Sequence, residues 1–172
     1  GLIFDYRTLI EHPLPAAQQT IIFLLLFFGF AVKTPLFPFH TWLPTVLREG
    51  PAGLGALLVG LKLGAFGILR LALPLVPAAA RDYVWLMAAL GLFGLLYGAL
   101  AALRQANLRK MLAFSSISHV GLAIVGIAAM NLQGIQGAIF QLTNFPVVAG
   151  GLMLLAGFLH HRLGSTDLAS LG

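Results

Sequence analysis

Long apolar stretches, separated by short polar connections, occupy most of this chain. A helix needs about 20 residues to cross roughly 30 Å of bilayer hydrocarbon. Five stretches reach that length, at residues 16–47, 52–76, 82–102, 107–130 and 133–160. We therefore predict an all-α, polytopic transmembrane helix bundle in a single membrane domain over residues 1–172.

The first stretch is too long for one straight span and contains Pro35, Pro38 and Pro44. Proline lacks a backbone N–H and clashes with the preceding helical turn. We expect the helix to break near residues 34–38, with Pro35 and Pro38 at the break. Non-helical backbone at membrane depth is tolerated where protein or a water cavity satisfies it, and transporters place such breaks at their ion sites.

Composition supports the membrane class. Hydrophobic residues make up 59% of the chain and charged residues 9%, with a mean hydropathy of +0.96. A soluble domain of 172 residues cannot bury so much apolar surface. The net charge of +5 and the pI near 10.3 would suggest nucleic acid binding in a soluble protein, but the basic residues are scattered along and between apolar stretches. We expect a lipid bilayer as partner and no nucleic acid.

The basic residues near the span ends fall unevenly on the two sides. One side carries Arg48, Arg104, Arg109, Lys110 and Arg162. The other side carries Arg7 and Arg81, with Arg70 close to it. Because cytoplasmic loops are enriched in Lys and Arg, we expect the first side to be cytoplasmic.

Two lysines, Lys33 and Lys62, lie inside apolar stretches without a nearby Asp or Glu. A charge at bilayer depth costs several kcal/mol, so it is normally kept where it faces a bundle interior or a wet cavity and handles ions. Burial disfavours the ammonium form, which favours proton exchange. The acids all map to span ends or connections: Asp5, Glu11, Glu49, Asp82 and Asp167. We therefore predict an ion-transport role for both lysines, with carboxylate partners from outside this sequence.

Further polar side chains are candidates for the same route. Ser115 and His119 are four residues apart and so share a helix face. His119 is either a proton relay, because imidazole titrates near neutrality, or a neutral hydrogen-bonded core residue. His40, which follows the Pro38 break, is either a relay or cavity residue or a cap for exposed backbone carbonyls.

The last span carries a polar cluster near its centre. Gln141, Thr143 and Asn144 lie there beside Pro146, in surroundings rich in Leu, Gly and Ala. Such a cluster with a helix breaker predicts a hydrated or kinked segment.

The chain has no cysteine, which excludes disulfides, thiolate-held iron–sulfur clusters and the usual zinc sites. It also lacks a phosphate-binding loop, a dinucleotide fingerprint, a Ser-His-Asp set and a paired-carboxylate arrangement. We expect no cofactor and no metal in this chain, so that redox chemistry belongs to other chains. Because it begins Gly1-Leu2-Ile3 and ends Leu171-Gly172, we expect a fragment of a longer protein.

Three runs occur in order along the chain. They are Lys33-Thr34-Pro35-Leu36-Phe37-Pro38-Phe39-His40-Thr41-Trp42-Leu43-Pro44 followed by Glu49-Gly50-Pro51, Leu61-Lys62-Leu63-Gly64-Ala65-Phe66-Gly67-Ile68-Leu69-Arg70, and residues 105–121. Together they resemble the antiporter-like subunits of respiratory complex I, over about residues 20–163. Among these subunits the chain is most similar to the M type of proton-pumping NADH:quinone oxidoreductase, because the L type usually has histidine where Lys62 stands. The N type is the nearer rival.

This resemblance implies a larger antiporter-like bundle with inverted repeats, of which the chain holds the end of one and the start of the next. Lys33 would be the broken-helix lysine, Lys62 the central relay lysine and His119 the relay histidine. NADH, FMN, iron–sulfur clusters and quinone would be bound by partner subunits. Other membrane and peripheral subunits, including neighbouring antiporter-like subunits, would be partners in an energy-transducing membrane, such as the bacterial inner membrane.

Several positions depart from the family's usual pattern. After Pro44 the chain has Thr45-Val46-Leu47, where relatives commonly have Asp-Ala-His. Asn107 stands where relatives have Asp, and Phe114 where they have Tyr. The pair Phe145-Pro146 replaces the common His-Gly. The last change removes a relay histidine. Two hypotheses follow: water held by Gln141, Thr143 or Asn144 bridges the gap, or the route differs in this protein.

These observations predict a non-redox subunit that moves protons across the bilayer, coupled to quinone reduction in other subunits. Lys33 would respond to a neighbouring carboxylate and change the proton affinity of Lys62, and protons would pass through water and His119. Two alternatives are a sodium/proton antiporter subunit and a purely structural membrane subunit. A bis-histidine haem subunit that uses His40 and His119 is a distant third.

Overall fold

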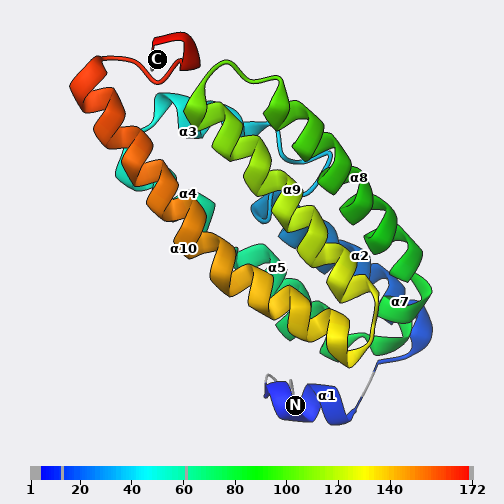
Figure 1. The fold of residues 1–172 in the computed structure, drawn as a ribbon. Coiled ribbons are helices and arrows are strands. Elements are labelled where there is room, and N and C mark those ends of the chain that lie inside the picture. Colours follow the sequence, from blue (N-terminus) through cyan, green and yellow to red (C-terminus); the bar gives the residue numbers. More distant parts are fainter. Residues whose placement is uncertain (1–4, 13, 61, 171–172) are drawn as a thin grey trace.

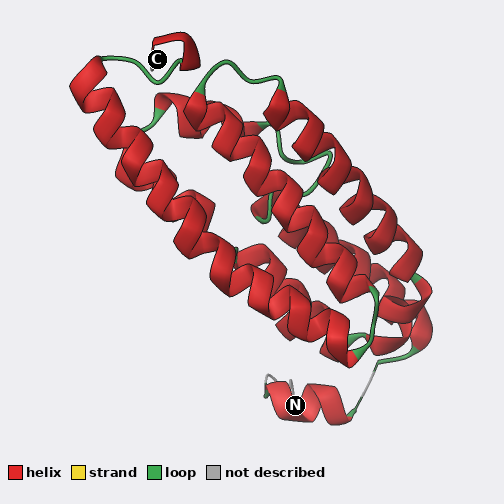
Figure 2. Ribbon diagram, viewed as in Figure 1, coloured by secondary structure: helices red, strands yellow, loops and turns green. Residues whose placement is uncertain are grey.

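The computed structural model describes residues 5–12, 14–60 and 62–170, which form helices and no β-strand (Figures 1 and 2). The long helices are α2 (Ala16–Lys33), α8 (Val84–Leu103), α9 (Leu108–Ala128) and α10 (Leu132–Leu163). The second apolar stretch is divided into α4 (Ala52–Gly60), α5 (Leu63–Gly67), a π-helix (Ile68–Ala72) and α6 (Leu73–Leu75). Within the described ranges, five regions are long and apolar enough to cross a membrane. The predicted all-α transmembrane bundle is confirmed.

Short helices lie at the ends of the bundle. They are α1 (Tyr6–Glu11), α3 (Trp42–Glu49), α7 (Pro77–Asp82) and a 3₁₀-helix (Leu168–Ser170). Helix α1 lies at one end, and α3 lies at the other with the segment after α10 (Figure 1). The end residues that suggested a fragment, Gly1-Leu2-Ile3 and Leu171-Gly172, lie outside the described residues, as does Leu61 of the second family-like run.

Helix α9 is the central element of the bundle. It packs against α8, α10 and α3, and it is the most buried of the five spans. It begins at Leu108 because the Asn107 side chain accepts hydrogen bonds from the backbone N–H groups of Arg109 and Lys110. Helices α8 and α9 approach closely, since a Cβ on Gly98 would lie 2.6 Å from the Ser118 nitrogen. Glycine at this position therefore permits direct contact between the two backbones.

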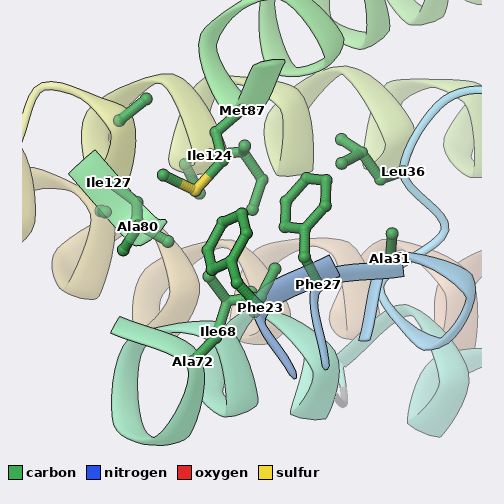
Figure 3. Close-up of a cluster of buried hydrophobic side chains, with 14 of the residues drawn as sticks. Phe23, Phe27, Ala31, Leu36, Ile68, Ala72, Ala80, Met87, Ile124 and Ile127 are labelled. Atoms are coloured by element: carbon green, nitrogen blue, oxygen red, sulfur yellow. The ribbon is translucent and has the colours of Figure 1, made fainter. Parts of the chain in front are cut away.

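Two apolar cores follow each other along the bundle. Figure 3 shows the first, in which Phe23 and Phe27 of α2 lie among residues of α5–α6, α7, α8 and α9. Their rings are stacked with centroids 5.7 Å apart. The second core joins α3, α4, α9 and α10 through residues such as Leu47, Ile117 and Met153. The functional side chains described below come from the spans that these two cores hold together.

The predicted break in the first stretch is confirmed. Helix α2 ends at Lys33, and α3 begins only at Trp42, so the break is wider than residues 34–38. The freed carbonyls have partners: Val32 O accepts from the Trp42 indole at 3.2 Å, and Phe30 O accepts from the N–H and hydroxyl of Thr34. Because these groups are satisfied within the protein, irregular backbone is tolerated at this depth.

Helix α10 continues through Pro146 from Leu132 to Leu163, rather than breaking there. Proline supplies no N–H, so the carbonyl of Leu142, four residues earlier, has no intrahelical donor from this position. The helix ends where Gly164 adopts a left-handed conformation with φ of 72° and donates to His160 O. The polar cluster of the last span is thus presented by an unbroken helix.

Residues of the two basic sides meet at opposite ends of the bundle. At the α3 end, Arg109 donates to the carbonyl oxygens of Arg48 and Gly50 at 3.0 and 2.6 Å. At the α1 end, the Arg70 guanidinium lies over the Tyr6 ring, and the Tyr6 hydroxyl donates to Arg70 O. That Arg109 and Arg48 lie at one end and Arg70 at the other supports the predicted division of the basic residues between two sides. Which end faces the cytoplasm stays a prediction.

Candidate proton-transfer site

The second span is interrupted at Lys62, which the sequence did not predict. Helix α4 ends at Gly60, Lys62 has non-helical dihedrals of φ −92° and ψ 45°, and α5 begins at Leu63. A π-helical segment follows at Ile68–Ala72. Such segments and breaks occur often at functional sites in membrane helices. Both sequence-predicted lysines therefore lie at interruptions of their spans.

Lys62 is buried and hydrogen-bonded to a neighbouring span. Its side chain is 7% exposed, and its Nζ donates to Ser116 Oγ of α9 at 2.6 Å. Ser116 is itself fully buried. A hydroxyl can accept a hydrogen bond from an ammonium and donate one to a neutral amine. Ser116 can therefore partner Lys62 in either protonation state.

His119 lies one helical turn beyond Ser116 on α9 and contacts α10. Its Nδ1 is 2.6 Å from Nε2 of Gln141, and its ring stacks on Phe145 with centroids 4.2 Å apart. A side-chain amide has both a donor and an acceptor, so this contact orients the imidazole and sets its tautomer. Helices α9 and α10 thus hold an oriented histidine beside the buried lysine.

Two spaces adjoin Lys62. The first is a cavity of about 270 Å³ lined by Gly60, Lys62, Leu63, Phe66, Leu69, Ile139, Leu142 and Thr143. The second lies between Lys62 and His119, with Val120, Gln141, Leu142 and Phe145 as its other walls, and it is too small for a water molecule. Lys62 and Leu142 belong to both linings, so the lysine stands between a space that can hold water and one that cannot.

Lys33 lies elsewhere, at the last residue of α2, and is exposed. The two breaks nevertheless adjoin, because α5 packs against α2. A Cβ on Gly64 would collide with Phe30 O and with the Thr34 side chain, so the backbones touch at that point. The structure therefore brings the helix ends that carry Lys33 and Lys62 together, although it gives the two ammonium groups no direct contact.

His40 occupies an aromatic pocket and not the Lys62 site. Its ring is 3% exposed and lies 5.4 Å from the Phe37 ring, 5.0 Å from Tyr97 and 6.5 Å from Phe114, measured between centroids. Its Nδ1 is buried without a hydrogen-bond partner among the described residues, so this nitrogen does not cap a carbonyl there. Residues 114 and 119 differ by about 140° around a helix. His40 and His119 thus lie on different sides of α9, which does not favour the haem alternative.

The remaining sequence candidates differ in their contacts. Gln141 belongs to the site through His119, and Thr143 lines the larger cavity while its hydroxyl bonds to backbone oxygens of its own helix. Asn144 is exposed and Ser115 half-buried, and neither side chain makes a hydrogen bond among the described residues. Instead Ser116, its neighbour, meets Lys62. The helical spacing that paired Ser115 with His119 could not show which side of α9 faces α5.

Carboxylates are missing from the site within residues 5–12, 14–60 and 62–170. The ion pair found there joins Arg48 and Glu49, which are neighbours at the end of α3. Groups of three or more His, Cys, Asp or Glu residues that could hold a metal are also absent from this part of the chain. The site therefore offers amine, hydroxyl and imidazole groups, which exchange protons.

Sequence reasoning missed three residues. Ser116 and Phe145 contact Lys62 or His119, and Arg109 is buried at the start of α9, where it ties down the α3–α4 connection. Ser116 carried a signal, since it lies in a Ser-Ser-Ile-Ser-His run. For Arg109, the sequence indicated only a loop charge. Its burial follows from two carbonyls that only the fold places around it.

The chain is similar in sequence to known membrane subunits. The chain is 37% identical to NADH-quinone oxidoreductase subunit M of Rickettsia prowazekii, over 98% of the chain and 35% of the relative. It is 38% identical to F(420)H(2) dehydrogenase subunit M of Methanosarcina mazei, over 98% of the chain and 35% of that protein. The chain thus spans about a third of the length of the curated relatives it matches. The resemblance to antiporter-like subunits, and to the M type among them, is confirmed.

Solved structures show the same fold. A chain of respiratory complex I from Thermus thermophilus matches with a TM-score of 0.88 and 37% identity, over 92% of this chain and 34% of that one. A chain of the Mrp complex from Dietzia sp. matches with a TM-score of 0.80 and 26% identity, over 88% of this chain and 30% of that one. The model of the NADH:quinone oxidoreductase/Mrp antiporter transmembrane family matches residues 4–172. The chain is a multi-pass membrane protein and belongs to this family.

Proposed function

We propose that this chain is part of an M-type subunit of a proton-pumping NADH:quinone oxidoreductase. It contributes no redox centre to this translocase and moves protons through buried Lys and His side chains and water. NADH, FMN, iron–sulfur clusters and quinone are bound by partner subunits, among them neighbouring antiporter-like subunits. Bacterial relatives such as that of Rickettsia prowazekii support the bacterial inner membrane as its location.

The observation that carries this proposal is the environment of Lys62. An amine that is 7% exposed, at a helix interruption inside an apolar span, bonds to a hydroxyl of α9. A permanently charged lysine at this depth needs a carboxylate close by, whereas among the described residues Lys62 has the Ser116 hydroxyl as its partner. A proton carrier needs instead a site where the charged and neutral forms are both supported, as the Ser116 hydroxyl allows.

The adjoining breaks support a role for Lys33. A charge change on Lys33, caused by a carboxylate elsewhere in the protein or in a neighbouring subunit, acts on Lys62 through a medium of low dielectric. Such a charge alters proton binding by whole pKa units, each worth about 1.4 kcal/mol. Lys62 then exchanges its proton toward His119. Coupling to quinone reduction follows if that carboxylate responds to the redox subunits.

The names of the relatives support the absence of donor chemistry in this chain. A relative named for F(420)H(2) is as similar as one named for NADH and quinone. Because similar membrane sequences belong to proteins named for different electron donors, we place the donor in other subunits and ion movement in this one.

The test is proton pumping by the complete complex in sealed, sodium-free vesicles, with Lys62→Ala compared to wild type at equal assembly and equal electron input to an artificial acceptor. We expect pumping to fall while assembly persists. Lys110→Ala, a charge removed near the start of α9, serves as the control and should pump normally. Full pumping by Lys62→Ala with normal stoichiometry would contradict the proton-carrying role of Lys62 and favour a structural role.

A sodium/proton antiporter subunit is the second candidate, because the family includes Mrp antiporters and the Dietzia Mrp chain shares the fold. Repeating the assay with and without sodium separates the two. Wild-type proton movement that appears only with sodium favours the antiporter, whereas sodium-independent pumping favours the oxidoreductase subunit.

A further inference from the structure

The groups of the site form two hydrogen-bonded pairs that do not connect. Lys62 bonds to Ser116, and His119 bonds to Gln141. Proton transfer needs donor and acceptor within about 2.6–3.2 Å, either directly or through one water. The space between the pairs is too small for a water molecule. A proton on Lys62 therefore has no route to His119 in this conformation.

The Phe145 side chain occupies the position between the two pairs. Its ring stacks on His119 at 4.2 Å between centroids, and Lys62 Nζ lies 5.9 Å from its centroid. A phenyl ring has neither a donor nor an acceptor, so it interrupts any hydrogen-bonded chain there. Removing the ring would enlarge the space between Lys62 and His119.

The charge on Lys62 affects how firmly the ring is held. An ammonium within about 6 Å of a ring centroid is attracted to the ring face. A neutral amine lacks this attraction. The ring is therefore held more firmly while Lys62 is protonated.

The helix around Phe145 is suited to local movement. Pro146 supplies no N–H, so one intrahelical hydrogen bond is lost directly beside Phe145, at Leu142. Leu142 also lines both spaces next to Lys62. The cavity of about 270 Å³ exceeds the volume of several water molecules, so water from that side could follow the ring's displacement.

We propose that Phe145 is the barrier residue between Lys62 and His119, and that its ring must move aside before water can bridge the two groups. The proposal rests on the proposed proton route. Phe145 takes no part in proton exchange itself. It determines when the two halves of the route connect.

The test uses the complete complex in sealed vesicles without electron donor, and measures how fast an imposed pH difference collapses. Phe145→Ala is compared with Phe140→Ala, which removes a 67% exposed ring from the same helix. We expect Phe145→Ala to speed the collapse roughly tenfold, which corresponds to a barrier lower by about 1.4 kcal/mol. Adding His119→Leu to Phe145→Ala should abolish the leak, because it removes the acceptor beyond the barrier.

Phe145→Leu replaces Phe145→Ala if the latter does not assemble, since leucine keeps apolar bulk but removes the ring face. A smaller leak is then expected. Collapse no faster than in Phe140→Ala, in an assembled complex, overturns the barrier. Pumping by Lys62→Ala, measured in the same vesicles, separates the barrier hypothesis from the proton-route hypothesis. If Lys62→Ala does not pump and Phe145→Ala does not leak, only the barrier is rejected. If Lys62→Ala pumps normally, the proton route itself is rejected.

Discussion

Lys62 Nζ and Ser116 Oγ form a buried hydrogen bond of 2.6 Å between residues 54 positions apart in the chain. This bond links the interrupted second span to the most buried span of the bundle. It places a buried amine within reach of a group that accepts or donates a hydrogen bond. The predictions below follow from this bond and the contacts around it.

Ser116→Ala should impair pumping more than Ser115→Ala. The first change leaves the Lys62 ammonium without its partner, and hydrogen bonds to charged groups contribute about 1.5–3 kcal/mol. The second removes a half-buried hydroxyl without a side-chain hydrogen bond among the described residues. Pumping per electron, measured in vesicles at matched assembly, should fall about tenfold or more for Ser116→Ala. Equal effects of the two changes would contradict the assignment.

Gln141→Leu should slow proton transfer, whereas Asn144→Leu should not. Leucine cannot bond to His119 Nδ1, so the tautomer and orientation of the imidazole are no longer fixed. Asn144 is on the same helix but exposed, which makes it a matched control. The measurement is the pumping rate of the assembled complex across pH. A Gln141→Leu complex with an unchanged rate and pH profile would show that the 2.6 Å contact has no role in transfer.

Gly64→Ala should destabilise the contact between the two helix breaks. The added methyl group would meet Phe30 O and Thr34, and forced overpacking typically costs about 1–3 kcal/mol. Gly29→Ala is the control, because a Cβ there has no neighbour within 4 Å. Thermal unfolding of the purified complex measures the difference. Equal melting temperatures for the two variants would count against close α2–α5 packing.

Arg109→Lys should weaken the α3 end of the bundle although it keeps the charge. The guanidinium donates to Arg48 O at 3.0 Å and to Gly50 O at 2.6 Å, and a lysine cannot hold both carbonyls in the same planar geometry. We expect a loss of about 1.5–3 kcal/mol for one such bond. Proteolysis between α3 and α4 should become faster, while Arg104→Lys, at an exposed position, should leave it unchanged.

The sequence by itself determined the class of this protein and indicated the candidate site residues. Apolar stretches of membrane-spanning length require helices, because only helices and closed barrels satisfy their backbone groups in lipid. The prolines after Lys33 indicated a helix break, because Pro35 and Pro38 have no backbone N–H to donate a helical hydrogen bond. Lys62 and His119 were identified because charged or titratable groups are costly at that depth.

Tertiary structure alone decided which of these groups meet. No proline in the sequence indicates the break at Lys62. The hydrogen-bond partner of the Lys62 amine is 54 residues away on another helix. Spacing along α9 placed Ser115 and His119 on one face but did not show that Ser116 faces Lys62. Likewise, the sequence indicated only that Phe145 stands where relatives commonly have a histidine. The position of its ring between Lys62 and His119 depends on how α10 packs against α9 and α4. Periodicity is a property of one helix, and contact requires the rotation and register of two.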